Sequence, residues 1–182
     1  MGTIVQTFEE VALPHLDAAY NLARWLTRNE RDAEDVAQEA YLRAFQHFRS
    51  FQGGDARPWL LAIVRNTYYT WIRRNRAPEV RTGFDDGIYA EMPDTSDPEM
   101  LLVKEADKQM LRRALEKLPD DFREVIVLRE FEELSYKQIA DVMQIPLGTV
   151  MSRLARARKR LEELLANPRD DKKTEELVVA AL

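Results

Sequence analysis

The amino-acid sequence predicts an all-α protein of two small helical domains joined by a flexible acidic linker, the second ending in a helix-turn-helix. Apolar residues recur every three or four positions through nearly the whole chain, which is typical of amphipathic helices. Proline, glycine and acidic residues gather between residues 77 and 98, where large apolar residues are few. Such a composition cannot bury enough apolar surface to fold alone, so it predicts a linker.

The first predicted domain begins with two helices. A helix over residues 13–26 places apolar side chains on a single face: Leu16, Ala19, Tyr20, Ala23 and Leu26. After a polar break at 29–32, a second helix runs from about Ala33 to Phe48. Its expected buried side carries Val36, Ala37, Ala40, Tyr41, Ala44, Phe45 and Phe48. Its opposite face is polar and carries Asp35, Gln38, Glu39, Arg43 and Gln46.

A third helix completes this domain as a unit of three or four helices. Gly53 and Gly54 interrupt the chain, and Pro58 fits the first turn of a helix that reaches Arg74. The side chains expected to pack inward from this helix are Trp59, Ile63 and Ile72.

The second predicted domain is also helical. Residues 99–118 form one helix, which Pro119 ends, and residues 122–131 form a shorter one. The segment 135–138 has the pattern of a capping box, in which serine and glutamine side chains bond backbone N–H groups at the start of a helix. After a break at 144–146, a last helix over 147–165 places apolar residues on one face: Val150, Leu154, Ala157, Leu161 and Leu164.

The last two helices and the turn between them match a helix-turn-helix. Several polar residues lie away from the apolar stripe of the last helix: Ser152, Arg153, Arg156 and Arg160. Arginine side chains can reach guanine edges or phosphates in the major groove, and the small residues Ser152 and Ala155 allow close approach. A helical hairpin with a solvated basic face is the other interpretation, and the pattern alone does not exclude it.

Composition narrows the classes of function. The chain of 182 residues has no cysteine and two histidines, which excludes disulfide scaffolds, thiolate metal sites and cysteine nucleophiles. Little material is left for a histidine metal site or a Ser-His triad, so we expect neither an enzyme nor a cofactor. No apolar stretch approaches the roughly 20 residues of a membrane span, and no signal peptide is recognisable. We therefore expect a cytoplasmic protein without direct membrane insertion.

The net charge of −5 conceals basic and acidic segments. Residues 51–76 carry a net charge of +4, residues 77–100 carry −6, and residues 135–166 carry +3. The acidic total argues against general nucleic-acid binding, whereas the two basic segments allow local phosphate contacts. The helix-turn-helix coincides with the second basic segment, which favours DNA binding.

Two sets of motifs resemble bacterial sigma factors. Residues similar to the fourth region of these proteins are Leu118–Arg129, Leu134–Met143, Ile145–Arg153 and Arg156–Arg158. Residues similar to their second region are Asp32–Phe45, Trp59–Asn66 and Arg73–Arg74. Having these two regions alone, joined by a short linker, is the layout of the extracytoplasmic-function sigma factors. The resemblance implies region 2 in residues 1–76, a linker in 77–98, region 4 in 99–166 and a C-terminal tail in 167–182.

The resemblance also implies three sets of site residues. The set that docks on the clamp helices of the largest subunit of core RNA polymerase is Asp35, Gln38, Glu39 and Arg43. The set that binds and opens the minus-ten promoter element is Phe51, Arg65, Asn66, Arg73 and Arg74. The set that faces the minus-thirty-five element is Arg129, Met151, Ser152, Arg153, Ala155 and Arg156. For Tyr68, Tyr69 and Trp71, stacking on bases and packing in the core both stay open.

Two residues depart from the family pattern: Thr70 is Asp in many relatives, and Met151 is often Arg. The predicted function is that of an alternative sigma factor. It would bind promoter DNA and core polymerase, through the clamp helices and the flap of the second-largest subunit, and act on no small-molecule substrate. The family also implies an anti-sigma factor as a partner. The alternative is a stand-alone helix-turn-helix regulator whose first domain senses a ligand.

Overall fold

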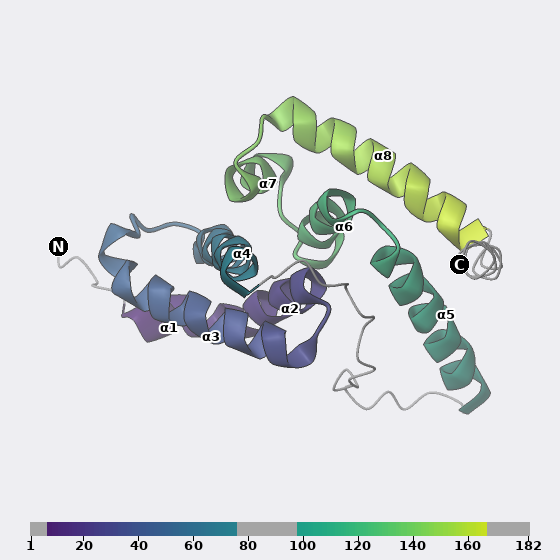
Figure 1. Ribbon diagram of the computed structural model, residues 1–182, viewed down its shortest axis with the longest axis horizontal. Coiled ribbons are helices and arrows are strands. Elements are labelled where there is room, and N and C mark those ends of the chain that lie inside the picture. The colour runs from purple at the N-terminus through teal and green to yellow at the C-terminus, as the bar shows by residue number, and fades with distance from the viewer. Residues whose placement is uncertain (1–6, 76–97, 167–182) are drawn as a thin grey trace.

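The computed structural model describes residues 7–75 and 98–166, and every element in these two ranges is helical (Figure 1). This observation confirms the predicted all-α class. The expected linker, except for Pro98, and the expected tail at 167–182 lie outside the described residues. Within the two ranges, no helix is both long enough and apolar enough to cross a membrane.

The first unit, residues 7–75, consists of α1(Phe8–Ala12), α2(Leu16–Thr27), α3(Glu30–Gln46) and α4(Ala56–Asn75), with 3-10 turns η1(Leu13–His15) and η2(Phe48–Ser50). Helix α3 begins earlier than the sequence predicts because Asn29 caps it. The Asn29 side chain accepts a 3.1 Å hydrogen bond from the backbone N–H of Asp32. Arg28, with φ of 59°, makes the tight turn between α2 and α3.

The prediction that Phe45 is buried is wrong, because this side chain is 60% exposed. The buried stripe of α3 consists of small side chains: Ala33, Val36, Ala37, Ala40 and Ala44. Phe45 lies one position beyond this stripe, so the helix turns it toward solvent. Its ring meets the edge of Phe8 from α1, with ring centroids 5.3 Å apart.

The side chains of α4 that were predicted to pack inward do pack against the core, but they are not its most buried ones. Trp59, Ile63 and Ile72 contact the core and are partly buried. The buried residues of this helix are Ala56, Leu60, Leu61, Val64, Thr67 and Tyr68. Helix α4 packs against α2 and α3 on one side and against α7 on the other, so these three neighbours together determine its buried face.

The second unit, residues 98–166, consists of α5(Pro98–Glu116), α6(Asp120–Ile126), a π-helical turn η3(Val127–Phe131), α7(Tyr136–Met143) and α8(Leu147–Ala166). The predicted capping box of α7 is confirmed. The Ser135 hydroxyl accepts a 3.2 Å hydrogen bond from Gln138 N–H, and the Gln138 side chain accepts a 2.8 Å bond from Ser135 N–H. Gln144, with φ of 54°, ends α7 and turns the chain into α8.

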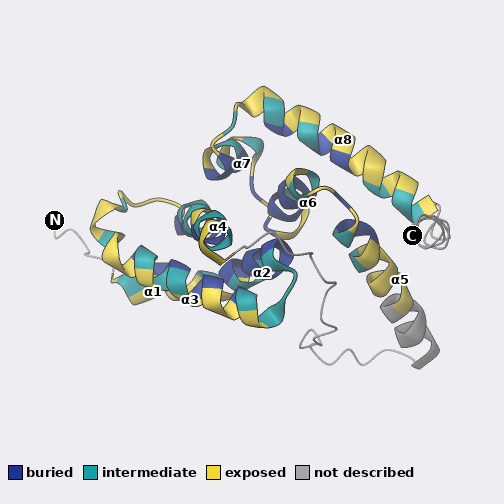
Figure 2. Ribbon diagram, viewed as in Figure 1, coloured by how far each residue is buried: buried dark blue, intermediate teal, exposed yellow. Residues whose placement is uncertain are grey.

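The apolar stripe of α8 packs as predicted. Val150, Leu154 and Ala157 are buried, and Leu161 and Leu164 pack against them partly exposed. The opposite side of α8 is exposed along most of its length (Figure 2).

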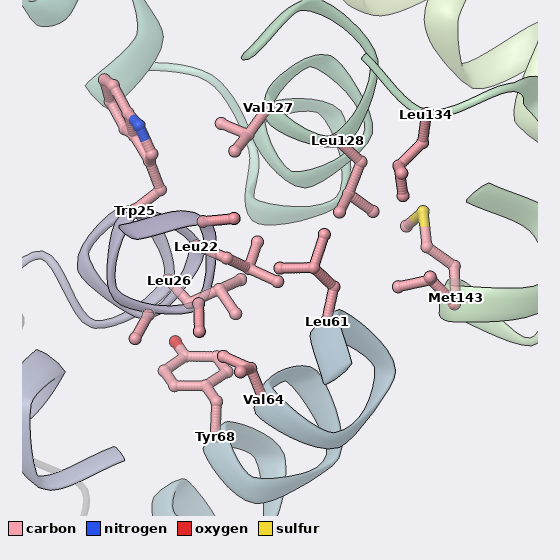
Figure 3. Close-up of a cluster of buried hydrophobic side chains, with 14 of the residues drawn as sticks. Leu22, Trp25, Leu26, Leu61, Val64, Tyr68, Val127, Leu128, Leu134 and Met143 are labelled. Atoms are coloured by element: carbon pink, nitrogen blue, oxygen red, sulfur yellow. The ribbon is translucent and has the colours of Figure 1, made fainter. Parts of the chain in front are cut away.

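The two units pack directly against each other and share an apolar core (Figure 3). The first unit contributes Leu22, Leu26, Leu61 and Val64, and the second contributes Val127, Leu128, Leu134 and Met143. Trp25 of α2 also faces Phe131 of η3, with ring centroids 5.7 Å apart. Helix α4 therefore lies at the junction of the two units, with consequences for its polar side chains.

Candidate functional site

The polar face of α3 is open to solvent. Asp35 and Gln38 are exposed, and Arg43 Nε donates a 2.8 Å hydrogen bond to Oε1 of Glu39 one turn away. The structure thus brings together all four residues of the predicted polymerase-docking set. The spacing of 35, 38, 39 and 43 keeps them on one side of the helix.

Two apolar residues on α3 were missed by the sequence analysis. Leu42 is 59% exposed and Phe45 is 60% exposed. Leu42 follows Gln38 by four positions and Asp35 by seven, so it lies within the polar face. This spacing was a usable signal, because a large apolar residue at the centre of a polar face is typical of a protein-binding surface.

Part of the predicted minus-ten set is exposed on and before α4. Asn66, Arg73 and Arg74 all reach solvent. Phe51 is partly buried in an aromatic cluster, with its ring centroid 5.0 Å from that of Trp59 and 6.1 Å from that of Phe48. These residues provide an amide, an apolar wall and two cations, the groups that single-stranded nucleic acid requires.

Arg65 of the same set is instead engaged by the second unit. Its Nε donates a 2.6 Å hydrogen bond to Oε1 of Glu124, whose side chain is 0% exposed. The Tyr69 hydroxyl donates to Oε2 of the same carboxylate at 3.2 Å. Burial raises the pKa of the Glu124 carboxyl, and Arg65 partly opposes this effect. The sequence offered no signal that these residues meet.

Two further ion pairs join the units in the same way. Arg57 Nη2 of α4 lies 2.5 Å from Oε2 of Glu132, and Arg28 Nη2 lies 3.1 Å from Oδ1 of Asp120. The Glu132 side chain is 2% exposed, and burial raises the pKa of its carboxyl. The cation of each pair comes from the first unit, and the carboxylate comes from the second.

The structure also bears on the aromatic residues of α4 that the sequence left open. Tyr68 is 3% exposed and belongs to the apolar core. The side chain of Trp71 is partly buried against the same core. Tyr69 is partly buried, and burial next to Glu124 raises the pKa of its hydroxyl. Core packing is therefore the correct interpretation for Tyr68.

The exposed side of α8 carries most of the predicted minus-thirty-five set. Met151, Ser152, Ala155 and Arg156 are all exposed, and their spacing places them on one face of the helix. Met151 is 52% exposed, which is high for a large apolar side chain. Arg156 is held over this face, because its Nε donates a 3.2 Å hydrogen bond to the carbonyl of Ser152.

The two remaining members of this set are tied to the second unit itself. Arg153 Nη2 lies 3.2 Å from Oδ2 of Asp121. Arg129 Nη1 donates a 2.7 Å hydrogen bond to the carbonyl of Leu134, and its guanidinium lies 5.1 Å from the ring centroid of Tyr136. Arg129 thus braces the turn between η3 and α7.

Comparisons with known proteins match both units to one family. A model of sigma-70 region 2 matches residues 12–77, and a model of sigma-70 region 4 matches residues 108–161. The chain is 34% identical to the ECF RNA polymerase sigma factor SigE of Mycolicibacterium smegmatis, over 88% of this chain and 62% of the relative. It is 32% identical to the RNA polymerase sigma-H factor of Pseudomonas aeruginosa, over 88% of this chain and 86% of the relative.

Further relatives and solved structures point the same way. The ECF RNA polymerase sigma-E factor of Escherichia coli K12 is 38% identical, over 72% of each chain. The sigma factor RpoE of Bartonella quintana, solved with the anti-sigma factor NepR, has a TM-score of 0.71 at 29% identity, covering 87% of this chain and 96% of that chain. CnrH, solved with the cytosolic domain of CnrY, has a TM-score of 0.58 at 26% identity, covering 87% of each chain. The chain therefore belongs to the extracytoplasmic-function (ECF) family of RNA polymerase sigma factors.

Proposed function

We propose that the chain is an alternative sigma factor that binds core RNA polymerase in the cytoplasm and directs transcription initiation at specific promoters. One observation carries the proposal: the two family regions present separate exposed faces, one polar on α3 and one with DNA-binding chemistry on α8. Region 2 would take residues 1–76 and region 4 residues 99–166, joined by a linker at 77–98 and followed by a tail.

The polar face of α3 would dock on the clamp helices of the largest polymerase subunit. Asp35 and Gln38 are free to bond a partner, and Glu39 and Arg43 hold each other in place. Leu42 would anchor this interface. A large side chain contributes most to the binding free energy when the contacts around it exclude water. The second unit would contact the flap of the second-largest subunit.

The first unit would bind the minus-ten element as a single strand. Asn66 can hydrogen-bond a base edge, and Phe51 can form one wall for a base that leaves the stack. Arg73 and Arg74 would hold the strand backbone. Binding energy alone would drive strand opening, so no hydrolytic reaction is required.

The second unit would bind the minus-thirty-five element as a duplex. The exposed face of α8 would enter the major groove with Met151, Ser152, Ala155 and Arg156 toward the bases. We also propose an anti-sigma factor as a partner. RpoE was solved in complex with the anti-sigma factor NepR, and CnrH was solved in complex with the cytosolic domain of CnrY.

Run-off transcription with core polymerase on genomic promoter fragments tests this function. The chain should support specific transcripts that core polymerase alone does not make. A stand-alone regulator would instead bind duplex DNA tightly without polymerase and would support no transcript. That result would refute the proposal.

Arg156→Ala tests the DNA face separately from the polymerase face. We expect about tenfold weaker binding to a promoter duplex in a gel shift, because a base or phosphate contact is lost. A polymerase pull-down should be unchanged. Arg113→Ala is the matched control, since it removes an exposed cation of the same unit from helix α5. Equal loss in both assays for Arg156→Ala would contradict the assignment.

A further inference from the structure

One face of α4 carries four residues at a spacing of four: Arg57, Leu61, Arg65 and Tyr69. This spacing places side chains near one another along a helix, so the four form one stripe, called here the α4 stripe. Its polar members bond carboxylates of the second unit, and Leu61 packs among the apolar side chains between the units (Figure 3). Arg73 is four positions further on and is exposed.

The carboxylates on the α4 stripe occupy positions that suit nucleic-acid phosphates. A carboxylate and a phosphate both offer arginine charged oxygen acceptors of similar geometry. Proteins bind single strands with rows of cations interleaved with aromatic rings. Arg57, Arg65 and Tyr69 form such a row, with the Arg65 guanidinium 4.7 Å from the Tyr69 ring centroid.

Arg65 is largely covered while it is bonded to Glu124, because its side chain is only 18% exposed. Its Nε is bonded to Glu124 at 2.6 Å in this structure, and the same group belongs to the predicted minus-ten set. The contact is not an isolated surface pair, because the Glu124 and Glu132 side chains are 0% and 2% exposed. Promoter DNA can therefore reach the stripe only if the second unit moves away.

We propose that the α4 stripe has two mutually exclusive occupants. In the free chain these are Glu124 and Glu132 of the second unit, and in the initiation complex they are the phosphates of single-stranded promoter DNA. This inference rests on the proposed function. The second unit is then an internal competitor that keeps the free chain from binding single strands.

While the second unit covers the α4 stripe, the polar face of α3 and the exposed face of α8 stay open to other partners. Asp35 and Gln38 of α3 are exposed while the units are in contact, and so are Met151 and Arg156 of α8. Polymerase and duplex DNA can therefore engage first, and the single strand can displace the carboxylates afterwards.

The ion pairs between the α4 stripe and the second unit are also suited to replacement by DNA phosphates. Removing a carboxylate and a guanidinium from water costs much of the energy that their attraction supplies. The raised pKa of Glu124 and of Glu132 shows that burial outweighs their arginine partners. Coupling between two binding events on one protein commonly changes an affinity between about 5-fold and 150-fold, so we expect closure to weaken strand binding about tenfold.

A cross-link across the junction tests whether the closed contact blocks DNA. The chain has no cysteine, so Asp55→Cys with Gln138→Cys provides one specific pair. Gln138 Nε2 donates a 2.9 Å hydrogen bond to Asp55 Oδ2, which places the two positions within reach of a short bismaleimide. We expect the free full-length chain to cross-link internally. The linked chain should bind labelled oligo(dT) at least about tenfold more weakly than the unlinked chain, and should lose run-off transcription.

The complementary variant opens the contact. Glu132→Lys, placed in the same cysteine pair, sets a cation against Arg57 and should lower the yield of cross-link. It leaves every residue of the α4 stripe in place, so it should bind oligo(dT) about tenfold more tightly. Glu162→Lys is the matched control, because it makes the same charge change at an exposed position of α8. It should cross-link normally and bind oligo(dT) about as the parent does.

Each result has a defined meaning. The inference is overturned if the free chain does not cross-link, if the linked chain binds oligo(dT) as well as the unlinked chain, or if Glu132→Lys opens the contact without tighter binding. Failure of the proposed function looks different. In that case the unlinked chain supports no specific run-off transcript, whatever its cross-linking yield and its affinity for oligo(dT).

Discussion

Replacing Leu61 with alanine removes a side chain that is 0% exposed and packs between the two units (Figure 3). Three carbon atoms are lost, and burial of each is worth about 0.8 kcal/mol, or about 2.4 kcal/mol together. The cavity left behind raises the expected loss of unfolding free energy to about 3 kcal/mol. Since domains are stable by only about 5–15 kcal/mol, this loss is a large share of the total.

Urea unfolding followed by circular dichroism measures this loss. Leu42→Ala is the matched control, because it makes the same chemical change at a position that is 59% exposed. We expect the control to change stability by no more than about 0.5 kcal/mol and to weaken binding to core polymerase about tenfold. A loss below about 1 kcal/mol for Leu61→Ala, or equal losses for both variants, would refute the shared core.

Three further outcomes are expected. Asn66→Ala should reduce opening of the minus-ten element in a permanganate footprint and leave duplex binding in a gel shift unchanged. Asn75→Ala, at the end of the same helix, is the control and should change neither strand opening nor duplex binding. Burial raises the pKa of Glu124 and Glu132 above the ordinary value of 4.5, so the folded chain holds more protons than the unfolded chain just above that pH. The free energy of unfolding should therefore fall as pH rises through this window in urea titrations, and Glu124→Gln should flatten the slope; a rise with pH would contradict the burial of these carboxyls. Ser135→Ala should lower the free energy of unfolding by about 1 kcal/mol through loss of the α7 cap, and an unchanged urea midpoint would argue against the capping box.

Local features of the fold could be predicted from the sequence. The capping box at Ser135 and Gln138 and the apolar stripe of α8 both depend on residues within a few positions of each other. The family motifs likewise placed the exposed residues of α3 and α8 correctly on their helices. Such features follow from helical periodicity, which the order of residues expresses directly.

Errors occurred where burial depends on distant segments. Phe45 was assigned to the core, but small residues fill the interior side of α3 and leave it 60% exposed. The most buried residues of α4 were not identified, because this helix is covered from two sides. A periodic pattern identifies one apolar face, and it does not identify a second neighbour.

The sequence alone determined the helical class, the approximate positions of the longer helices, the cap of α7, the charge of each segment and the family to which the chain belongs. Only the tertiary structure decided which arginines of the first unit are exposed and which are bonded to carboxylates of the second unit. Arg65 meets Glu124 across 59 positions of sequence, and Arg57 meets Glu132 across 75. Pairs so distant are brought together by the shared apolar core. For this reason no local spacing could reveal that Arg65 is bonded to a carboxylate while Arg73 remains exposed.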